Sequence, residues 1–302
     1  MRVLVTGGLG FIGSRLCSAL LDEGFEVRCV DDLSGAAATS AGFALAASPG
    51  SALAARGAEV MVAGADPAHV RGVDAVLHLA ARPGVRTRRA PTVLHAANAG
   101  LSDRLAAAAA RRRARFLLVS SSSVYGDARL LPTPEHAPLA PLNPYAASKV
   151  AAERAVLARG GDPVIVRPFT VYGPGQRPDM AFARWIVAIQ AGEPIPWHAP
   201  PGTARDFTYV DDAVAGLIAA LRHGRSGEAY NVSGWSSADL RDAIELLGAP
   251  AIRELPCTTA EALVTSGCGR KAAAELGYEP RVALADGLAR QLAAATSLSL
   301  AA

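Results

Sequence analysis

The chain has 302 residues, of which 51% are hydrophobic and 19% charged, and its formal net charge is +3. These values are typical of a globular protein and exclude a disordered or fibrous one. The small net charge and the lack of a long basic run also argue against a nucleic-acid partner.

The cysteines stand at positions 17, 29, 257 and 268, with no C-x-x-C pair and no spacing typical of metal ligands. We therefore expect reduced thiols, no metal site and a cytoplasmic protein. No stretch approaches 18 apolar residues without charges or turn formers, so no membrane span is predicted. The first residues enter a predicted strand directly, and we expect no signal peptide.

The first half of the chain alternates short apolar strands with longer helical segments. This alternation predicts an α/β fold with a doubly wound parallel sheet, in which ligands bind at the carboxyl ends of the strands. The predicted helices are Phe11–Glu23, Pro91–Arg112 and Tyr145–Arg159. The predicted strands are Val3–Thr6, Glu26–Val30, Glu59–Val62, Ala75–Leu79, Phe116–Ser120 and Val164–Arg167.

After Arg167 the amino-acid composition changes, because Pro and Gly cluster at 168–178 and 193–202. We predict a Rossmann domain over residues 1–168, to which 205–225 returns. A smaller mixed α/β substrate lobe is expected over 169–204 and 226–302. The predicted elements here are helices Met180–Ala191 and Asp211–Arg222 and strand Ala229–Val232, and Cys257–Leu276 is left unassigned.

A glycine loop of spacing G-x-x-G-x-x-G joins the first predicted strand to the first helix, with glycines at Gly7, Gly10 and Gly13. Such a loop lets the backbone approach a pyrophosphate at the helix N-terminus. The second strand runs into Asp31, whose carboxylate can accept hydrogen bonds from the adenosine ribose and repels a 2′-phosphate. The pattern predicts NAD in preference to NADP; the alternative is an ordinary glycine turn.

Tyr145 and Lys149 are spaced to lie on one face of a predicted helix that Asn143 and Pro144 begin. A phenol is a poor base at neutral pH, and an adjacent ammonium lowers its pKa. The chain has 30 Lys and Arg residues but its only lysines are Lys149 and Lys271, so a lysine here indicates a need for a compact ammonium. By itself, however, this spacing also occurs by chance on helix surfaces.

Four consecutive serines, Ser120 to Ser123, end a buried strand and lead into Val124-Tyr125-Gly126. Hydroxyl groups at the carboxyl end of a parallel strand lie where ligands bind. A serine-rich turn is the alternative, but it does not explain why the run ends a strand.

These motifs together resemble the extended short-chain dehydrogenase/reductases of the NAD-dependent epimerase/dehydratase family, which act on nucleotide sugars. The resemblance continues over nearly the whole chain, through these segments: Leu79-Ala80-Ala81, Asn98, Arg167-Pro168-Phe169-Thr170-Val171-Tyr172-Gly173-Pro174, Arg205-Asp206-Phe207-Thr208-Tyr209-Val210-Asp211-Asp212, and Lys271 to Tyr278. Two departures are Cys268, where the family usually has Asp, and the short Pro256–Ser266 segment.

The resemblance implies a role for each matching residue. Ser121 would polarise the sugar 4-hydroxyl, Tyr145 would be the base, and Lys149 would hold the nicotinamide ribose and tune Tyr145. The implied NAD contacts are Gly7, Gly10, Phe11, Ile12, Gly13, Asp31, Asp32, Leu33, Ser34, Leu79, Ala80, Ala81, Asn98, Ser120, Tyr145, Lys149, Pro168 and Val171. The family also suggests a homodimer.

The reaction expected from this resemblance is epimerisation at C4 by transient oxidation. Dehydratases and decarboxylases of the family carry acidic residues where this chain has Ser122 and Ser123, and neither serine can act as an acid or base for elimination. A decarboxylase, a 4-ketoreductase and a non-catalytic NAD-binding sensor are the alternatives; the last is disfavoured by intact Ser121, Tyr145 and Lys149.

The run from Thr170 to Ala181 resembles the UDP-glucuronate 4-epimerases, in which a Thr and an Arg hold the sugar carboxylate. Thr170 and Arg177 would play these parts here, which suits an anion. Alternatively, Arg177 pairs with Asp179 or the diphosphate, and the substrate is neutral UDP-glucose. The substrate contacts implied are Arg82, Ser121, Ser122, Ser123, Thr170, Arg177 and Arg205.

Overall fold

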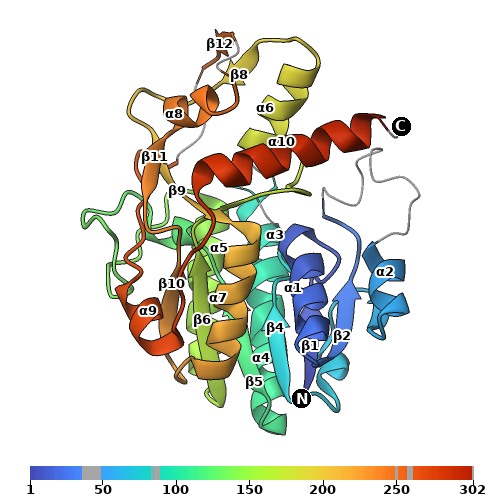
Figure 1. Cartoon of the computed structure of the whole chain (residues 1–302). Helices are drawn as coiled ribbons and strands as arrows, with labels where there is room; N and C mark the ends of the chain where they lie inside the picture. Colours follow the sequence, from blue (N-terminus) through green and yellow to red (C-terminus); the bar gives the residue numbers. More distant parts are fainter. Residues whose placement is uncertain (36–48, 83, 85–88, 249–250, 257–260, 301–302) are drawn as a thin grey trace.

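The computed structural model describes residues 1–35, 49–82, 84, 89–248, 251–256 and 261–300. Its centre is a parallel sheet of seven strands in the order β10-β6-β5-β4-β1-β2-β3 (Figure 1). The doubly wound α/β fold expected from the sequence is thus confirmed. The strands are β1 (Arg2–Thr6), β2 (Glu26–Asp31), β3 (Glu59–Val62), β4 (Ala75–His78), β5 (Arg115–Val119), β6 (Asp162–Pro168) and β10 (Ala229–Val232).

Alternate side chains of each strand point to opposite faces of the sheet, and each face is covered by its own helices. On β1, Val3 and Val5 join one core cluster, whereas Leu4 joins the other. Helices α1 (Phe11–Asp22) and α7 (Val210–His223) lie side by side on the first face (Figure 1). Helices α4 (Leu101–Arg112) and α5 (Pro144–Ala158) cover the second.

The structure differs from the expected elements in three places within this domain. Strand β10 pairs with β6, so the chain returns to the sheet beyond residue 226 as well as at α7. The predicted helix Pro91–Arg112 is divided into α3 (Pro91–His95), a π-helical turn η4 (Ala96–Gly100) and α4. Helix α2 (Pro49–Ala55) was not predicted, because its short alanine-rich sequence lacks a helix period.

A smaller lobe covers the carboxyl ends of the strands. It contains a three-stranded sheet and a separate pair of strands, and the final helix lies between the lobe and the central sheet (Figure 1). Its elements are β7 (Thr170–Tyr172), α6 (Ala181–Gln190), β8 (Ile195–Trp197), β9 (Ala204–Tyr209), β11 (Ser237–Asp239), α8 (Leu240–Glu245), β12 (Ile252–Glu254), α9 (Arg270–Leu276) and α10 (Leu284–Leu300).

Helix α10 was not expected from the sequence, and its position depends on a single glycine. A methyl group on Gly287 would lie 2.1 Å from the hydroxyl oxygen of Tyr172, so only glycine permits this approach. Tyr172 is fully buried on β7, two residues beyond Thr170. The C-terminal helix therefore packs directly behind the strand that enters the lobe.

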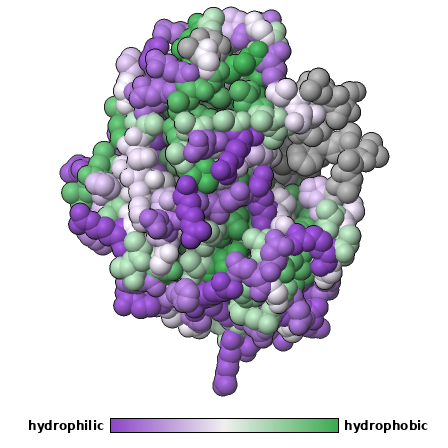
Figure 2. Space-filling model, in the orientation of Figure 1, coloured by the Kyte–Doolittle hydropathy of each residue, from purple (hydrophilic) through white to green (hydrophobic). Residues whose placement is uncertain are grey.

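The surface is polar over most of the sheet domain, and hydrophobic residues gather on the lobe in the view of Figure 2. In the described part of the chain, no helix is long and apolar enough to span a bilayer. Cys17, Cys29 and Cys268 are free thiols, and Cys257 lies outside the described residues.

His78 is buried at the end of β4, between two other elements. Its Nδ1 lies 2.7 Å from Thr6 Oγ1 on β1, and its Nε2 lies 3.0 Å from Ser102 Oγ on α4. Burial, with the nearby charge of Lys149 as a second cause, lowers the pKa of His78 to about 3. The ring is therefore neutral and links the sheet to α4 near the glycine loop.

We expect His78→Gln to weaken the acid sensitivity of folding. The unfolded chain protonates this histidine below pH 6.5, whereas the folded protein does not until about pH 3. Its contribution to the free energy of unfolding is present above pH 6.5 and falls by about 1.4 kcal/mol per pH unit below that value.

Urea unfolding near pH 7 and near pH 5 measures this difference. The variant should lose less stability between the two values than the wild type does. The exposed His136 provides the control, because His136→Gln should leave the wild-type pH dependence intact. An equal loss in His78→Gln and wild type would contradict the assignment.

Candidate functional site

A cleft of about 1300 Å³ lies at the carboxyl ends of the strands, between the sheet and the lobe. It gathers most of the residues predicted from the sequence, although they come from distant parts of the chain. Among them, Leu33 and Asn98 do not line it. The predicted residues that do are Gly7, Gly10, Phe11, Ile12, Gly13, Asp31, Asp32, Ser34, Leu79, Ala80, Ala81, Arg82, Ser120, Ser121, Ser122, Ser123, Tyr145, Lys149, Pro168, Thr170, Val171, Arg177 and Arg205.

The glycine loop has the geometry that a pyrophosphate requires. Gly7 adopts a φ of +73°, and a methyl group on Gly13 would lie 2.1 Å from the carbonyl oxygen of Gly7. Gly10 precedes α1 and provides no side-chain cap, so the first amides of the helix face the cleft without a side chain over them. A helix N-terminus of this kind favours an anion.

Asp31 connects the end of β2 to the glycine loop. Its carboxylate accepts hydrogen bonds from the backbone amides of Leu9, at 3.0 Å, and Leu33, at 2.8 Å. Leu33 contributes this amide from a left-handed conformation with a φ of 56°. Leu33 therefore shapes the loop through its backbone, and its side chain, 41% exposed, points away from the cleft lining.

Arg82, predicted as a substrate contact, lies beside the end of β2 and lines the cleft there. Its guanidinium is 3.2 Å from the Asp32 carboxylate and also donates to Ser34 Oγ. Asn98, predicted as a cofactor contact, is only 1% exposed and accepts from the Arg82 amide at 2.7 Å. It also donates to Ser148 on α5 at 2.9 Å, and so fixes the backbone around the cleft from behind.

The predicted catalytic residues converge in the middle of the cleft. Asn143 caps α5 by accepting from the Ala146 amide at 2.9 Å, which places Tyr145 and Lys149 in the first turns of the helix. Ser121 caps the short helix η5 (Ser122–Tyr125), and its hydroxyl lies near enough to the Tyr145 phenol to affect the pKa of the phenol. The serine hydroxyl and the phenol can therefore share a proton with one substrate oxygen.

The electrostatics of Tyr145 differ from the expectation that Lys149 would lower its pKa. Burial raises the pKa of Tyr145, and the charge of Arg177 and the hydrogen bond with Ser121 oppose this rise. Lys149 instead donates to the carbonyl oxygen of Val119 at 2.9 Å. Burial lowers the pKa of Lys149 to about 8, while the carboxylate of Glu153 favours the charged form.

A buried ion pair supports these residues from the side of the sheet. Glu153, one turn beyond Lys149, receives two hydrogen bonds from Arg167, at 3.0 and 2.7 Å, and both side chains are almost fully buried. Glu153 also accepts from the Ser120 hydroxyl at 2.5 Å. The predicted cofactor contact Ser120 is thus anchored to α5 at the start of the serine run.

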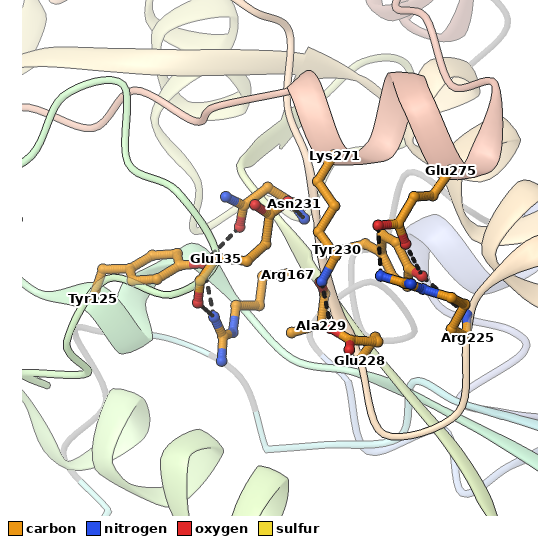
Figure 3. A network of polar contacts seen from close by, with 10 residues as sticks. All are labelled: Tyr125, Glu135, Arg167, Arg225, Glu228, Ala229, Tyr230, Asn231, Lys271 and Glu275. Carbon is orange, nitrogen blue, oxygen red and sulfur yellow. Dashed lines mark hydrogen bonds and ion pairs between the residues drawn. The ribbon is translucent and has the colours of Figure 1, made fainter.

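The same pair extends toward the edge of the sheet. Arg167 donates to the hydroxyl of Tyr125 at 2.8 Å, and that hydroxyl donates to Asn231 on β10 at 2.7 Å (Figure 3). The backbone amide of Asn231 in turn donates to the Glu135 carboxylate at 2.9 Å. Residues from β6, β10 and the segment after the serines are therefore connected in one network.

Lys271 lies in the same view, but its contacts are structural and it does not line the cleft. Its ammonium donates to Glu228 at 2.6 Å and to the Ala229 carbonyl at 2.9 Å, and it sits 4.7 Å from the centre of the Tyr230 ring (Figure 3). A compact ammonium suits this site between a ring, a carboxylate and a carbonyl. The contacts attach α9 to the edge strand β10.

The lobe side of the cleft is lined by the predicted substrate contacts and by several residues not predicted. Arg177 donates to Asp179 through Nε at 2.9 Å and Nη2 at 2.8 Å, the pairing weighed as an alternative from the sequence. Arg205 lies 3.3 Å from the carboxylate of Glu261. The lining residues not predicted include Gln176, Asp179, Arg184 and Glu261. Two of them, Asp179 and Arg184, could have been found from the sequence, because they are charged residues close to the predicted start of a helix at Met180.

Within the described ranges, no group of three or more His, Cys, Asp and Glu side chains could hold a metal ion. Cys268 donates its amide to the Thr133 carbonyl at 2.9 Å. Of the short Pro256–Ser266 segment, residues 257–260 lie outside the described residues.

Comparison with known proteins gives consistent matches over this whole architecture. The model of the NAD-dependent epimerase/dehydratase family matches residues 3–233. An uncharacterised UDP-glucose epimerase of Bacillus subtilis is 33% identical, with 99% of each chain covered. A dTDP-glucose 4,6-dehydratase of Actinoplanes is 34% identical, with 97% of each covered. The UDP-glucuronic acid 4-epimerase of Bacillus cereus, solved with UDP-glucuronic acid and NAD, has a TM-score of 0.90 and 32% identity, over 99% of this chain and 100% of that one.

Lys149→Met is expected to stabilise the folded protein near neutral pH. The pKa of Lys149 is about 8 in the folded protein, below the ordinary value of 10.5. Burying the ammonium therefore lowers the free energy of unfolding, and this loss is fully present below pH 8. Removing the charge should recover about 2 kcal/mol after allowing for the lost hydrogen bond to Val119.

Thermal unfolding of the cofactor-free protein at several pH values checks this prediction. The advantage of the variant should shrink as the pH rises from 8 toward 10.5, where the unfolded lysine also becomes neutral. A variant that is less stable than wild type at neutral pH would show that Lys149 contributes more as a hydrogen-bond donor than its burial costs.

Glu153→Gln is expected to destabilise the fold by about 3–5 kcal/mol, because Arg167 would remain charged and buried without its partner. The double variant Glu153→Met/Arg167→Met removes both charges and should lose much less than the single variant. Urea unfolding of the two proteins measures the difference. A loss below about 1 kcal/mol in Glu153→Gln would show that the pair is solvated in solution.

Proposed function

Because the chain belongs to the NAD-dependent epimerase/dehydratase family, we propose that it is a UDP-sugar 4-epimerase that interconverts UDP-glucuronate and UDP-galacturonate. NAD is its cofactor. The glycine loop and the amides at the start of α1 would hold the pyrophosphate, and the Asp31 carboxylate would hold the adenosine ribose. Arg82 and Asp32 would flank that ribose.

One observation carries the choice of reaction. Ser121 and Tyr145 are in contact in the cleft, and the two positions after Ser121 hold hydroxyl groups where elimination would need carboxyl groups. The hydroxyls of Ser122 and Ser123 ionise too weakly near neutral pH to serve as the acid or the base of an elimination, so dehydration has no acid–base pair here. The dehydratase relative therefore shares the fold and the oxidation step in this proposal, but not the elimination.

The residues of the chain then have separate tasks in the epimerisation. Bound NAD would supply the reversible acceptor for a hydride from C4 of the sugar. Tyr145, as its phenolate, would take the proton of the 4-hydroxyl, and Ser121 would hold the same oxygen. Lys149 positions the nicotinamide ribose. After the 4-keto sugar turns over in the cleft, Tyr145 would return the proton to the same oxygen.

Thr170 and Arg177 support a uronate as the substrate. Two of the five N–H groups of Arg177 bond Asp179, which leaves three for a sugar carboxylate. In the described part of the chain, its guanidinium has no hydrogen-bond partner besides Asp179. Holding the carboxylate would also restrain loss of CO2 from the 4-keto-uronate, which is a β-keto acid.

UDP-glucose is the second candidate substrate, and the Arg177–Asp179 ion pair is the observation that favours it. An arginine whose charge is balanced within the protein has less need of an anionic ligand. The likeness to the Bacillus subtilis epimerase supports the same alternative. Homodimer formation, and a division of the chain into an NAD domain and a substrate lobe, remain parts of the proposal.

The proposal is tested by incubating the purified protein with UDP-glucuronate and with UDP-glucose, without added cofactor, and identifying the products by NMR. We expect UDP-galacturonate from the first and little conversion of the second. Tyr145→Phe should keep its bound NAD and lose at least about 10³-fold in turnover, since general acid–base catalysis contributes on that order.

Other products would overturn particular parts of the proposal. UDP-4-keto-pentose as the main product would mean a decarboxylase, and turnover only with added NADH would mean a reductase. Conversion of UDP-glucose alone would replace the substrate. Unchanged activity of Tyr145→Phe would exclude the mechanism.

A further inference from the structure

Three charged side chains, Arg177, Asp179 and Arg184, line the lobe side of the cleft and come from one short segment. Arg177 and Asp179 precede α6, the helix that Figure 1 shows in the lobe. Arg184 lies in the first turn of α6, where its amide donates to the Met180 carbonyl at 3.0 Å. The segment therefore presents two cations and one carboxylate to the same end of the cleft.

Both cations act on the one carboxylate, but in different ways. Asp179 receives two hydrogen bonds from Arg177, whereas Arg184 acts on it by its charge. The guanidinium of Arg177 and the charge of Arg184 together hold the pKa of Asp179 below its usual range, so the carboxylate stays ionised. The three groups sum to one positive charge.

This sum matters because Arg177 and Asp179 alone would be neutral. A sugar carboxylate entering the site would then meet Asp179 as a like charge, at the few ångströms that separate two ligands of one guanidinium. Arg184 supplies the charge that offsets Asp179. The nearby pair of Arg205 and Glu261 consists of opposite charges and leaves this sum unaltered.

We propose that Arg184 is a specificity-determining residue, which offsets Asp179 and so keeps the charge of Arg177 available to an anionic sugar. This inference rests on the proposed function, since it assigns the site a substrate with a carboxylate. Asp179 opposes anionic substrates, whereas Arg184 favours them. Neutral sugars are indifferent to both.

The experiment is a double-mutant cycle on ligand binding. Calorimetry with NAD-loaded Tyr145→Phe protein, which cannot turn over, gives the Kd of UDP-glucuronate and of UDP-glucose for four proteins: the parent, Arg184→Gln, Asp179→Asn and the double variant. Arg253→Gln is the matched control, because Arg253 is an exposed arginine of the same lobe outside the cleft lining.

For UDP-glucuronate, we expect Arg184→Gln to weaken binding about tenfold and Asp179→Asn to tighten it about threefold or more, as one unit of charge changes near the carboxylate. The double variant should return to within about threefold of the parent. All Kd values for UDP-glucose should stay within about twofold, and the effects should shrink at high salt. Arg253→Gln should change the Kd of neither ligand.

Several outcomes would overturn the inference. Equal weakening of both ligands by Arg184→Gln would mean that Arg184 holds the shared diphosphate. Unchanged Kd ratios, or weaker UDP-glucuronate binding in Asp179→Asn, would remove the charge balance as the basis of selectivity. Melting temperatures of all variants confirm that each is folded.

Failure of the proposed function gives a separate result. If the parent binds UDP-glucose but no UDP-glucuronate, the proposed substrate is wrong. Asp179→Asn then decides the inference by itself: a gain of UDP-glucuronate binding supports it, and no gain overturns it.

Discussion

The buried ion pair between Glu153 and Arg167 is the interaction on which the arrangement of the cleft depends. It joins α5 to the end of β6, and through Ser120 it fixes the start of the serine run. Glu153 also favours the charged form of Lys149, one helical turn away. A buried pair of this kind contributes little net stability, but losing one partner is costly. Its value lies in holding three elements in one relative position.

Charge is distributed unevenly along the cleft. At the end of β2, Asp32 pairs with Arg82, whereas the middle of the cleft is occupied by Ser121 and Tyr145. The lobe end carries a net positive charge. A dinucleotide with a free 2′-hydroxyl would complement the end of the cleft at β2, and a sugar with a carboxylate would complement the lobe end. The choice of substrate and the selectivity for an anion therefore both depend on the charged segment at the lobe end.

The local sequence pattern predicted the central sheet well, because its strands are short apolar runs and the segments between them have the residue pattern of helices. The boundaries of β3 and β10 agree with the prediction, and the other strands differ by one or two residues. Elements whose formation depends on distant contacts were missed. Helix α10 is placed by the approach of Tyr172 to Gly287, and the π-helical turn at Asn98 interrupts what reads as one continuous alanine-rich helix.

The sequence alone determined the fold class, the glycine loop and the spacing of Tyr145 and Lys149, because these depend on residues close together in the chain. Which charges act on those residues was decided by the tertiary structure. Arg177 influences Tyr145 from 32 positions away, Arg82 faces Asp32, and Lys149 turns toward Val119. Electrostatic interactions depend on distance in space and on burial, and neither quantity can be read from the order of residues in a chain.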